Sequence, residues 1–456
     1  MKRFNYARPP LGLAYLAANV GRENAENVGV EIVDCMAEGL GADELLSALV
    51  AKKPWMAGFL VVTATAATFR EISRSLKKAS PETFILAGGP HATVLPADRV
   101  FEWADAVVVG EGETTFSEII GARLSGSGVE NIPGVHASDK SGGGPWKPRR
   151  LIENLDSLEP PGRQYLKNGK YYHSFPYRTG RGSIFTTLFT TRGCPHSCCF
   201  CANEVLWGRR LREFSVPYVM NEFELVERKF GAGLVFIDDD DFTFNRGRMR
   251  EICEAKLGAG LGFKWICHAR VEDLHPEAFP LMKRAGCVEM QLGIESGVEE
   301  IRRTIPKKFS SAEGIEKIRV AKRHGINVWA TFIIGHESDT PETVRKTIEY
   351  SVAANPTYAS FILMLPLPGT RVFESFKSKG YLKTTNWADY SWHSDPVFEL
   401  PGLPSERVVA LRSEAYRRFF IRTRKLLELF FFTIKAGRLD EMGRNFLSWF
   451  SLVFKE

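Results

Sequence analysis

Three cysteines in one short loop have the clearest chemical potential in this sequence. Cys194, Cys198 and Cys201 follow the spacing C-x3-C-x2-C, and the aromatic residue Phe200 precedes the last of them. Three thiolates this close in sequence can converge on one soft metal centre. A structural zinc site needs four protein ligands, and Cys199 is a poor fourth because adjacent side chains point apart. A 4Fe–4S cluster on three cysteines leaves one iron open to an exogenous ligand, so we favour a cluster over zinc.

The elements around this loop predict a partial barrel of parallel strands. An apolar, β-branched and aromatic run at residues 184–191 indicates a buried strand, which Gly193 and Pro195 then break. Helical stretches separate five further apolar runs, and six strand–helix units fall short of a closed eight-unit barrel. The helix-start signals are Ser215 with Pro217, Pro276, Ser310 with Ser311, and Thr340 with Pro341. The expected strands are 184–191, 234–238, 263–270, 288–293, 327–334 and 358–364.

Polar or glycine residues follow most of these strands. In a parallel barrel the carboxyl ends of the strands surround the active site. The candidate groups at these ends are 194–201, Asp238–Asp241, His268 with Arg270, 293–297 and 335–337.

The amino-terminal third of the chain predicts a second α/β unit. Short apolar strands alternate with helical stretches, which indicates a parallel, doubly wound sheet. Ligands bind such sheets at the carboxyl ends of strands, where glycine turns lie, although tight turns alone would also explain Gly88-Gly89 and Gly110-x-Gly112. The expected strands are 30–34, 57–63, 84–87 and 106–109, and the expected helices are 13–20, 42–51, 66–78 and 114–124.

Composition limits the class of protein. The 456 residues allow two or three domains, and 44% apolar with 25% charged residues is ordinary for a globular chain. A net charge of +6 from 60 basic and 54 acidic residues is too balanced to indicate nucleic-acid binding. Eight cysteines, four of them in one loop, do not form a disulfide framework and favour a reducing cytoplasm. We expect no signal peptide and no membrane-spanning helix.

The cysteine loop and the strand ends after it resemble the radical S-adenosylmethionine (SAM) signature and barrel. The order of turns before it, Pro-Pro-Leu-Gly, then Gly-Gly-Pro-His, then Gly-Glu-Gly-Glu, resembles a cobalamin-binding domain. Together they resemble cobalamin-binding radical SAM enzymes over roughly residues 8–425. The nearest branch holds anaerobic magnesium-protoporphyrin IX monomethyl ester cyclase and hopanoid-tailoring enzymes. The implied domains are 1–140 (cobalamin-binding), 141–182 (linker), 183–400 (radical SAM barrel) and 401–456 (helical).

The resemblance implies roles around SAM. Cys194, Cys198 and Cys201 would hold the cluster and Phe200 would lie against SAM. Glu295 and Ser296 would hold the ribose, Arg270 would meet the carboxylate, and Ile334 with Gly335 would pack on the adenine. Family members often carry Gly-x-Pro-Gly-Glu at the last position, where this chain has Gly-His-Glu-Ser-Asp. The run Asp238–Asp241 is open to three interpretations: a contact to the SAM amino group, a contact to substrate, or a solvated turn.

The resemblance also implies a cobalamin site with two departures. Residues 1–7 are too short and polar to supply the first strand of such a domain, so that strand is expected to be missing. The Asp-x-His-x-x-Gly motif is absent, and we interpret His91 as a turn residue, with no histidine below the cobalt. The residues implied to surround cobalamin are Pro10, Gly12, Thr63, Gly88, Gly89, Gly110 and Gly112.

The function implied is reductive cleavage of SAM at the cluster, giving a 5′-deoxyadenosyl radical that attacks an unactivated carbon. The outcome would be C-methylation or oxidative cyclisation or rearrangement of a tetrapyrrole, a lipid or another secondary metabolite. No catalytic residue is assigned. The alternatives are a radical SAM enzyme without cobalamin and a non-catalytic iron–sulfur or zinc module. A flavodoxin- or ferredoxin-type electron donor is the expected protein partner, with no nucleic acid.

The carboxyl-terminal region combines basic and apolar residues. Residues 406–434 predict one or two helices, in which Arg422, Arg424 and Lys425 precede the apolar run 426–434. A second aromatic stretch occupies 448–454. A helical cap on the barrel is the favoured interpretation, and weak peripheral contact with a membrane or lipid-like substrate is the alternative.

Overall fold

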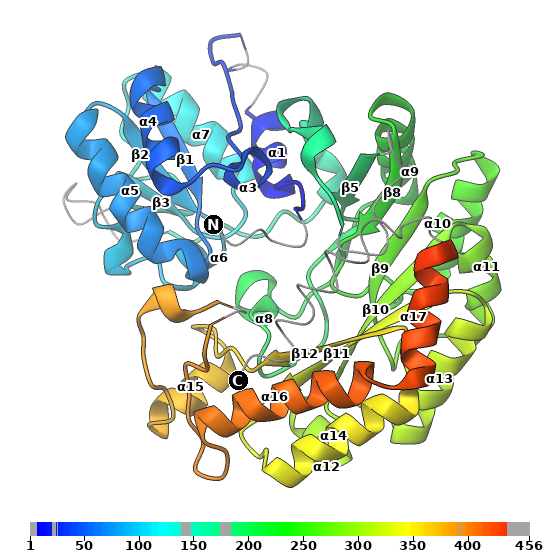
Figure 1. Cartoon of the computed structure of the whole chain (residues 1–456). Coiled ribbons are helices and arrows are strands. Elements are labelled where there is room, and N and C mark those ends of the chain that lie inside the picture. The colour runs from blue at the N-terminus through cyan, green and yellow to red at the C-terminus, as the bar shows by residue number, and fades with distance from the viewer. Residues whose placement is uncertain are drawn as a thin grey trace.

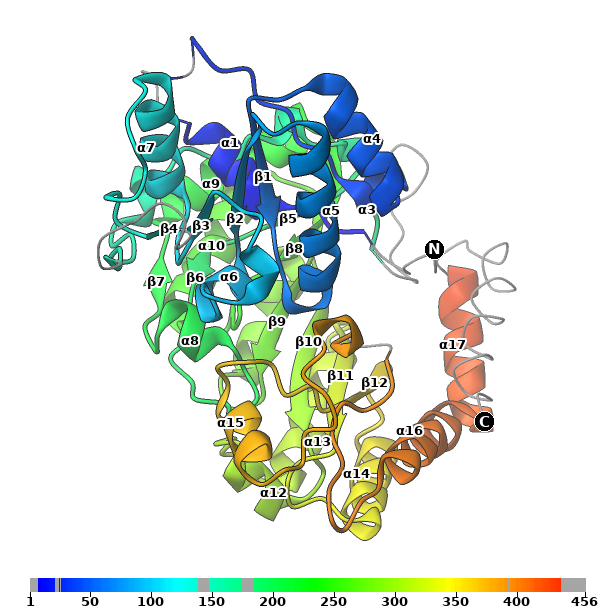
Figure 2. The same cartoon turned by 90° about the vertical axis from the view of Figure 1, so that its left-hand side faces the viewer.

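The structure is a computed structural model of the whole chain, and it describes residues 7–20, 24, 26–137, 147–173, 184–391 and 394–435. Figure 1 and Figure 2 show two α/β units facing each other, with the carboxyl-terminal helices along the second unit. The predicted stretches 141–146 and 448–454 lie outside the described residues.

The first unit is a four-stranded sheet in the order β1-β2-β3-β4. The first three strands are parallel and β4 is antiparallel to β3. Helices α4 and α5 lie on one side of the sheet, and α1 and α7 lie on the other (Figure 1), which confirms the doubly wound expectation. The strands are β1 Met56–Leu60, β2 Phe84–Gly88, β3 Ala106–Val108 and β4 Val135–Ala137. The helices are α1 Leu11–Ala18, α3 Cys35–Glu38, α4 Ala42–Lys52, α5 Ala66–Ala79, α6 Pro90–Val94 and α7 Glu113–Leu124.

The strand predicted at residues 30–34 is wrong. No described strand pairs with this segment, and β1 pairs within the described residues only with β2. The side chain of Asp34 instead caps α3 by accepting hydrogen bonds from the amides of Met36 and Ala37. Ile32 is buried among the residues that line α1 and the barrel, not in the sheet. The apolar character of the segment therefore reflects packing onto α1 and not strand pairing.

The second unit is a six-stranded, all-parallel sheet in the order β12-β11-β10-β9-β8-β5. Every strand neighbours its predecessor along the chain, as expected for a partial barrel. All six predicted strands are present, with ends shifted by a few residues. They are β5 Ile184–Leu188, β8 Ala232–Ile237, β9 Lys264–Arg270, β10 Cys287–Glu295, β11 Asn327–Ile334 and β12 Tyr358–Leu363.

The helices of the barrel begin where the sequence indicates. Ser215, Ser310 and Thr340 each accept a hydrogen bond at the start of the following helix, and Pro341 occupies its first turn. Pro276 begins a short 3-10 turn that leads into α11. The helices are α8 Asn203–Trp207, α9 Val216–Glu224, α10 Arg246–Gly258, α11 Phe279–Arg284, α12 Glu299–Thr304, α13 Ser311–Arg323, α14 Pro341–Ala354 and α15 Arg371–Ser378.

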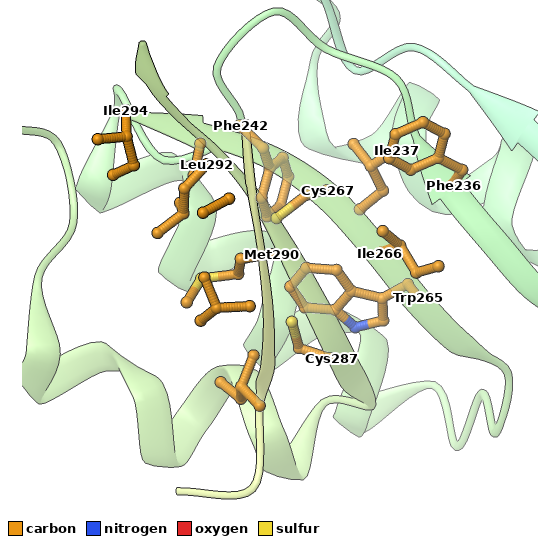
Figure 3. Close-up of a cluster of buried hydrophobic side chains, with 14 of the residues drawn as sticks. Phe236, Ile237, Phe242, Trp265, Ile266, Cys267, Cys287, Met290, Leu292 and Ile294 are labelled. Carbon is orange, nitrogen blue, oxygen red and sulfur yellow. The ribbon is translucent and has the colours of Figure 1, made fainter. Parts of the chain in front are cut away.

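The barrel core is apolar and continuous. Figure 3 shows Trp265, Cys267, Cys287 and Met290 packed together between strands and helices. Cys253 also belongs to this core, so three of the cysteines outside the loop are buried thiols. The same core includes Leu11, Ala14 and Tyr15 of α1, which therefore packs on the barrel as well as on α7. The first helix thus joins the two units.

Two carboxyl-terminal helices, α16 Ser405–Phe420 and α17 Thr423–Lys435, confirm the helical expectation. Helix α16 lies along α14 and β12 (Figure 1) and buries Leu411, Ala415 and Phe419. Helix α17 exposes a stripe of apolar side chains. No helix among the described residues is long and apolar enough to cross a membrane. The exposed residues of the stripe are Leu426, Leu427, Phe430, Phe431 and Ile434.

We predict that Phe419→Ala destabilises the protein while Phe431→Ala does not. The Phe419 side chain is fully buried against Phe361, so its removal should leave a cavity and cost about 3–5 kcal/mol of unfolding free energy. Phe431 is 64% exposed and is the matched control. Chemical denaturation of the two variants measures the difference. Equal midpoints would show that α16 does not act as a structural cap.

Candidate active site

The cysteine loop is held closed at its base. After β5 the chain forms β6 Thr191–Arg192, which pairs antiparallel with β7 Arg212–Glu213 on the far side of the loop. Gly193 has φ +88°, and a Cβ there would collide with the carbonyl oxygen of Arg210. The amide of Cys201 donates to the carbonyl of Cys198, which turns the loop between these two cysteines. Cys194, Cys198 and Cys201 are therefore presented at the carboxyl end of β5.

A buried carboxylate anchors the chain just before the loop. Asp239 is 1% exposed, and its side chain accepts hydrogen bonds from the amides of Thr190 (2.6 Å) and Thr191 (3.0 Å) and from the Thr190 hydroxyl. Burial raises the pKa of Asp239 to about 6, although these hydrogen bonds oppose the shift. Arg248 holds the other side of Thr190 through its hydroxyl and carbonyl. Asp239 therefore has a structural role in the acidic run.

The other three aspartates of the run face different partners. Asp238 accepts a hydrogen bond from Arg8 (2.9 Å) and lies 3.4 Å from His268. Burial opposes ionisation of Asp238, but His268 and Arg8 outweigh it and lower its pKa. Asp241 is buried and accepts from the amide and hydroxyl of Thr243. Only Asp240 is exposed, so the interpretation as a SAM or substrate contact concerns Asp240 and the mouth-facing Asp238.

His196, between the first two cysteines, tethers the loop to the neighbouring strand ends. Its Nε2 lies 3.0 Å from Asp273 and 3.7 Å from Asp241. The hydrogen bonds to Asp241 and Asp273 raise the pKa of His196, so the imidazolium form is favoured. The loop is thereby fixed at its centre as well as at its base.

The chemistry of the thiols fits an iron–sulfur cluster. Burial raises the pKa of Cys194 to about 12 and that of Cys201 to about 11, and the charge of Asp240 adds to both shifts. A metal centre must therefore displace protons from these sulfurs, as thiolate ligation requires. Arg270 Nη1 donates to Cys198 Sγ at 3.0 Å, while its buried Nε has no hydrogen-bond partner within the described residues. The positive charge of Arg270 beside three half-buried sulfurs would stabilise an anionic cluster and an anionic group bound next to it.

The two residues predicted to hold the SAM ribose, Glu295 and Ser296, make different contacts in this structure. Glu295 has φ +65°, which is strained for a residue other than glycine, and its carboxylate lies 3.0 Å from Lys307. Lys307, which the sequence did not single out, is buried and also donates to the carbonyl of Gly293. The Ser296 hydroxyl interacts with Thr347 and accepts from the amide of Val298, so it holds a turn. Of the two predicted ribose residues, Glu295 is therefore the one with a strained backbone, and its role in holding SAM stays a prediction.

A cavity of about 450 Å³ lies beside the cysteine loop at the ends of β11 and β12. Gly335, next to the lining residue His336, has φ +102°, and a Cβ there would collide with the ring of Phe398. His336 is 3% exposed, and its Nε2 has no hydrogen-bond partner within the part of the chain that the structure describes. An unpartnered buried nitrogen facing a cavity is costly unless a ligand satisfies it. The lining includes Cys199, Ile305, His336, Met364 and Arg371.

The glycine turns of the first unit differ in what requires glycine. A Cβ at Gly12, in the first turn of helix α1, or at Gly110, after β3, would meet no atom within 4 Å, so the backbone is open at both positions. At Gly89, with φ +100°, a Cβ would lie 2.6 Å from Leu60, so packing already explains that glycine. A Cβ at Gly112 would lie 3.1 Å from Leu16, and one at Gly88 would make ordinary contact with Val108. Open backbone beside Pro10, where α1 begins, fits a large planar ligand over the strand ends.

His91 is enclosed, which supports its interpretation as a structural histidine. It is 1% exposed, its Nδ1 lies 3.2 Å from the hydroxyl of Thr63, and its Nε2 lies 3.5 Å from Asp98. Trp387, from the segment after α15, covers the imidazole edge-to-face and donates to Asp98 at 2.8 Å. The Thr63 hydroxyl thus contacts His91, and neither side chain is exposed at the ends of the strands.

Comparison with known proteins identifies both units. The model of the B12 binding domain matches residues 2–120, and that of the radical SAM superfamily matches residues 188–351. An uncharacterized methyltransferase of Pyrococcus horikoshii is 32% identical over 92% of this chain and 89% of its own length. The chain belongs to the cobalamin-binding radical SAM family. The predicted resemblance, the fold class and the assignment as a radical SAM enzyme are thereby confirmed.

Other members of the family are more distant. The anaerobic magnesium-protoporphyrin IX monomethyl ester cyclase of Rubrivivax gelatinosus is 26% identical over 91% of this chain and 74% of its own length. The hopanoid C-3 methylase of Methylococcus capsulatus is 25% identical over 82% and 70%. The structure of the radical SAM methyltransferase TsrM from Kitasatospora setae superposes with a TM-score of 0.69 at 17% identity, covering 91% of this chain and 86% of that chain. At this identity the likeness shows the fold alone.

We predict that Asp239→Ala prevents cluster assembly, because two buried backbone amides and a hydroxyl lose their acceptor at about 1–3 kcal/mol each. Asp239→Asn keeps an acceptor and should fold. Because the folded pKa of Asp239 is raised, its contribution to stability is present below pH 4 and is lost as the pH rises through 6. The stability of wild type relative to Asp239→Asn should fall by about 2–3 kcal/mol over that interval. A pH-independent difference in denaturation would contradict this role.

We also predict that Ala at Cys194, Cys198 or Cys201 abolishes both cluster content and SAM cleavage. Cys199→Ala is the matched control and should retain both, since its neighbour Cys198 points to Arg270 while Cys199 lines the cavity. Iron and sulfide analysis after anaerobic purification measures the outcome. Iron-free wild-type protein with stoichiometric zinc would refute the cluster.

Proposed function

We propose that this chain is a cobalamin-dependent radical SAM methyltransferase that cleaves SAM reductively and modifies an unactivated carbon of a small molecule. The observation that carries the proposal is that ion pairs of Arg192 with Glu111 and Glu113 hold the three-cysteine loop next to the turn after β3, where the backbone of Gly110 is open. Methyl transfer is favoured because the relative matched over 89% of its length is named a methyltransferase. Oxidative cyclisation is the second candidate, supported by the likeness to the anaerobic cyclase.

The chemistry of the bound groups sets what the protein must do. A 4Fe–4S cluster with SAM supplies a 5′-deoxyadenosyl radical, and cobalamin supplies methyl-group transfer. Cys194, Cys198 and Cys201 would hold the cluster. The polypeptide would then orient SAM, exclude water from the radical and hold the substrate between the two cofactors.

Each SAM group has a partner among the described residues. The carboxylate would meet the buried guanidinium of Arg270, and the amino group would meet the exposed Asp240. The ribose hydroxyls would donate to Glu295, whose carboxylate Lys307 holds in place at 3.0 Å. The adenine would pack on Phe200, Ile334 and Gly335, next to the cavity lined by His336, whose buried Nε2 has no hydrogen-bond partner among the described residues. His336 occupies the variable position of the Gly-x-Pro-Gly-Glu pattern, and Glu337 stands where family members carry proline.

The cobalamin site would lie over the first sheet. Gly12 and Gly110 would let the corrin approach the backbone, with Pro10, Thr63, Gly88, Gly89 and Gly112 shaping the turns around it. Because His91 is enclosed by Thr63, Asp98 and Trp387, we expect no histidine below the cobalt. A His91→Ala variant that loses nitrogen coordination of cobalt would contradict this expectation.

The substrate would bind where the two units meet. His268 and Asp238 lie at the ends of neighbouring strands, and Arg8 reaches Asp238 from the segment just before Pro10. All three side chains are about a quarter to a third exposed, so they offer polar contacts at the mouth of the barrel. The relatives act on tetrapyrroles and on other small molecules by their names, and a tetrapyrrole, a lipid or another secondary metabolite is the proposed class.

Two further partners belong to the proposal. Reduction of the cluster requires an electron donor of the flavodoxin or ferredoxin type. The apolar stripe of α17 supports weak contact with a lipid surface, although Lys425 is buried against the carbonyl of Pro356 and does not face outward. Sedimentation with anionic vesicles at low salt tests that contact, and Phe431→Asp should weaken it.

We predict that the anaerobically reconstituted protein converts SAM to two products when given cobalamin, a reductant and substrate. 5′-Deoxyadenosine reports reductive cleavage, and S-adenosylhomocysteine reports methyl transfer. Both products should form. 5′-Deoxyadenosine alone would favour cyclisation over methylation, and neither product would reject the proposed function.

We further predict that Glu295→Ala lowers SAM affinity about tenfold or more while the cluster stays intact. Loss of the carboxylate leaves the ribose hydroxyls without an acceptor, at about 1–3 kcal/mol each, and leaves the buried Lys307 without its countercharge. Glu299→Ala, a surface carboxylate beyond the same strand, is the matched control. Equilibrium dialysis with SAM measures the affinities. Unchanged binding in Glu295→Ala would remove Glu295 from the site.

A further inference from the structure

Four charged side chains are buried between the two units. Glu111 lies 2.7 Å from Arg192 and 2.7 Å from Arg212, and Glu113 lies 2.6 Å from Arg192. All four side chains are at most 8% exposed. We call Glu111, Glu113, Arg192 and Arg212 the inter-domain ion-pair cluster.

The position of this cluster in the sequence connects the two candidate cofactor sites. Glu111 and Glu113 alternate with Gly110 and Gly112 in the turn after β3. Arg192 lies two residues before Cys194, in the β6–β7 pair that closes the cysteine loop. The glycine turn and the sulfur loop are therefore linked directly by side chains, whereas the covalent path between them runs through the whole linker.

The hydrogen bonds of the inter-domain ion-pair cluster fix the orientation of the Arg192 side chain. Arg192 uses its two terminal nitrogens on two different glutamates, which fixes the plane of its guanidinium. The ring of Tyr15, from α1, lies over that guanidinium at 5.0 Å. Glu111 also accepts a hydrogen bond from the amide of Ile152, and Arg212 donates to the carbonyl of the same residue. The cluster therefore also holds this residue of the linker in place.

Stability alone does not account for these charges. Replacement of a buried ion pair by apolar residues of similar volume is often neutral or stabilising, because desolvation offsets the attraction. Arg212 in addition keeps Nε and Nη2 buried with no hydrogen-bond partner within the described residues. Charge-assisted hydrogen bonds from both terminal nitrogens of Arg192 to two glutamates instead fix the relative orientation of the elements that carry these residues.

We propose that the inter-domain ion-pair cluster positions the cobalamin turn relative to the cysteine loop, so that these residues set the separation and orientation of the two cofactors. This inference rests on the proposed function for its catalytic meaning. Its geometric content, a fixed relation between the two units, is independent of any bound cofactor. Glu111, Glu113, Arg192 and Arg212 are positioning residues, since they act through the loops that they hold.

The test measures inter-unit distance in the full chain. Spin labels are placed at the exposed positions Lys78 on α5 and Ala312 on α13 through a ketone-bearing unnatural amino acid, because the chain has eight cysteines. Pulsed electron paramagnetic resonance measures the distribution of distances between the two labels in wild type, Glu113→Gln and Arg192→Lys. The control is Glu222→Gln, which breaks a buried ion pair with Arg163 (3.1 Å) at the barrel. If Glu113→Gln fails to fold, the inference is tested with Arg192→Lys. This variant keeps the positive charge but loses the two terminal nitrogens that contact two different glutamates.

We expect a narrow distribution in wild type and control, and one about twofold broader or displaced in both cluster variants. In reconstituted protein, those variants should keep their iron and cobalamin but yield about threefold less S-adenosylhomocysteine per 5′-deoxyadenosine. Distributions as narrow as wild type in both variants, or equal broadening in Glu222→Gln, would overturn the inference. Wild-type protein that takes up no cobalamin would instead reject the proposed function, while the label distances would still decide the positioning role.

Discussion

Parallel strand pairing in sequence order is the constraint on which the rest of this structure depends. It brings the carboxyl ends of six strands to one edge, so residues 170 positions apart, Cys194 and Met364, lie at the same edge of the sheet. That edge is mostly buried, and the charged groups there require partners. Asp239 has the Thr190 and Thr191 amides, Glu295 has Lys307, and each of these pairs fixes a loop or a strand end.

The first unit meets this edge through a small number of specific contacts. Helix α1 packs on the barrel core, Trp387 reaches His91 and Asp98, and Arg8 reaches Asp238. Glu111 and Glu113, in and just after the glycine turn that follows β3, pair with Arg192 two residues before Cys194. The fold therefore places that glycine turn next to the cysteine loop.

The sequence predicted local features well because they depend on neighbouring residues. The six barrel strands were marked by apolar runs that end in glycine or polar residues, and the helix starts by Ser215, Ser310 and Thr340. The three cysteines are predicted as cluster ligands from their spacing, the strand before them and Phe200, and this assignment stays a prediction. The segment 30–34 was mistaken for a strand because Ile32 is buried by packing and not by pairing. Partners distant in sequence could not be predicted: no local pattern indicates that Lys307 joins Glu295, or that one aspartate of four consecutive residues is the anchor.

The cofactor content of one chain tests the account most directly. Wild-type protein, purified and reconstituted without oxygen, is analysed for iron, acid-labile sulfide and cobalamin against protein concentration. The account predicts one 4Fe–4S cluster and one cobalamin per chain, with a cobalt spectrum that lacks nitrogen coordination from the protein. A chain that retains the cluster but no cobalamin under saturating conditions, or that binds zinc in place of iron, would contradict it.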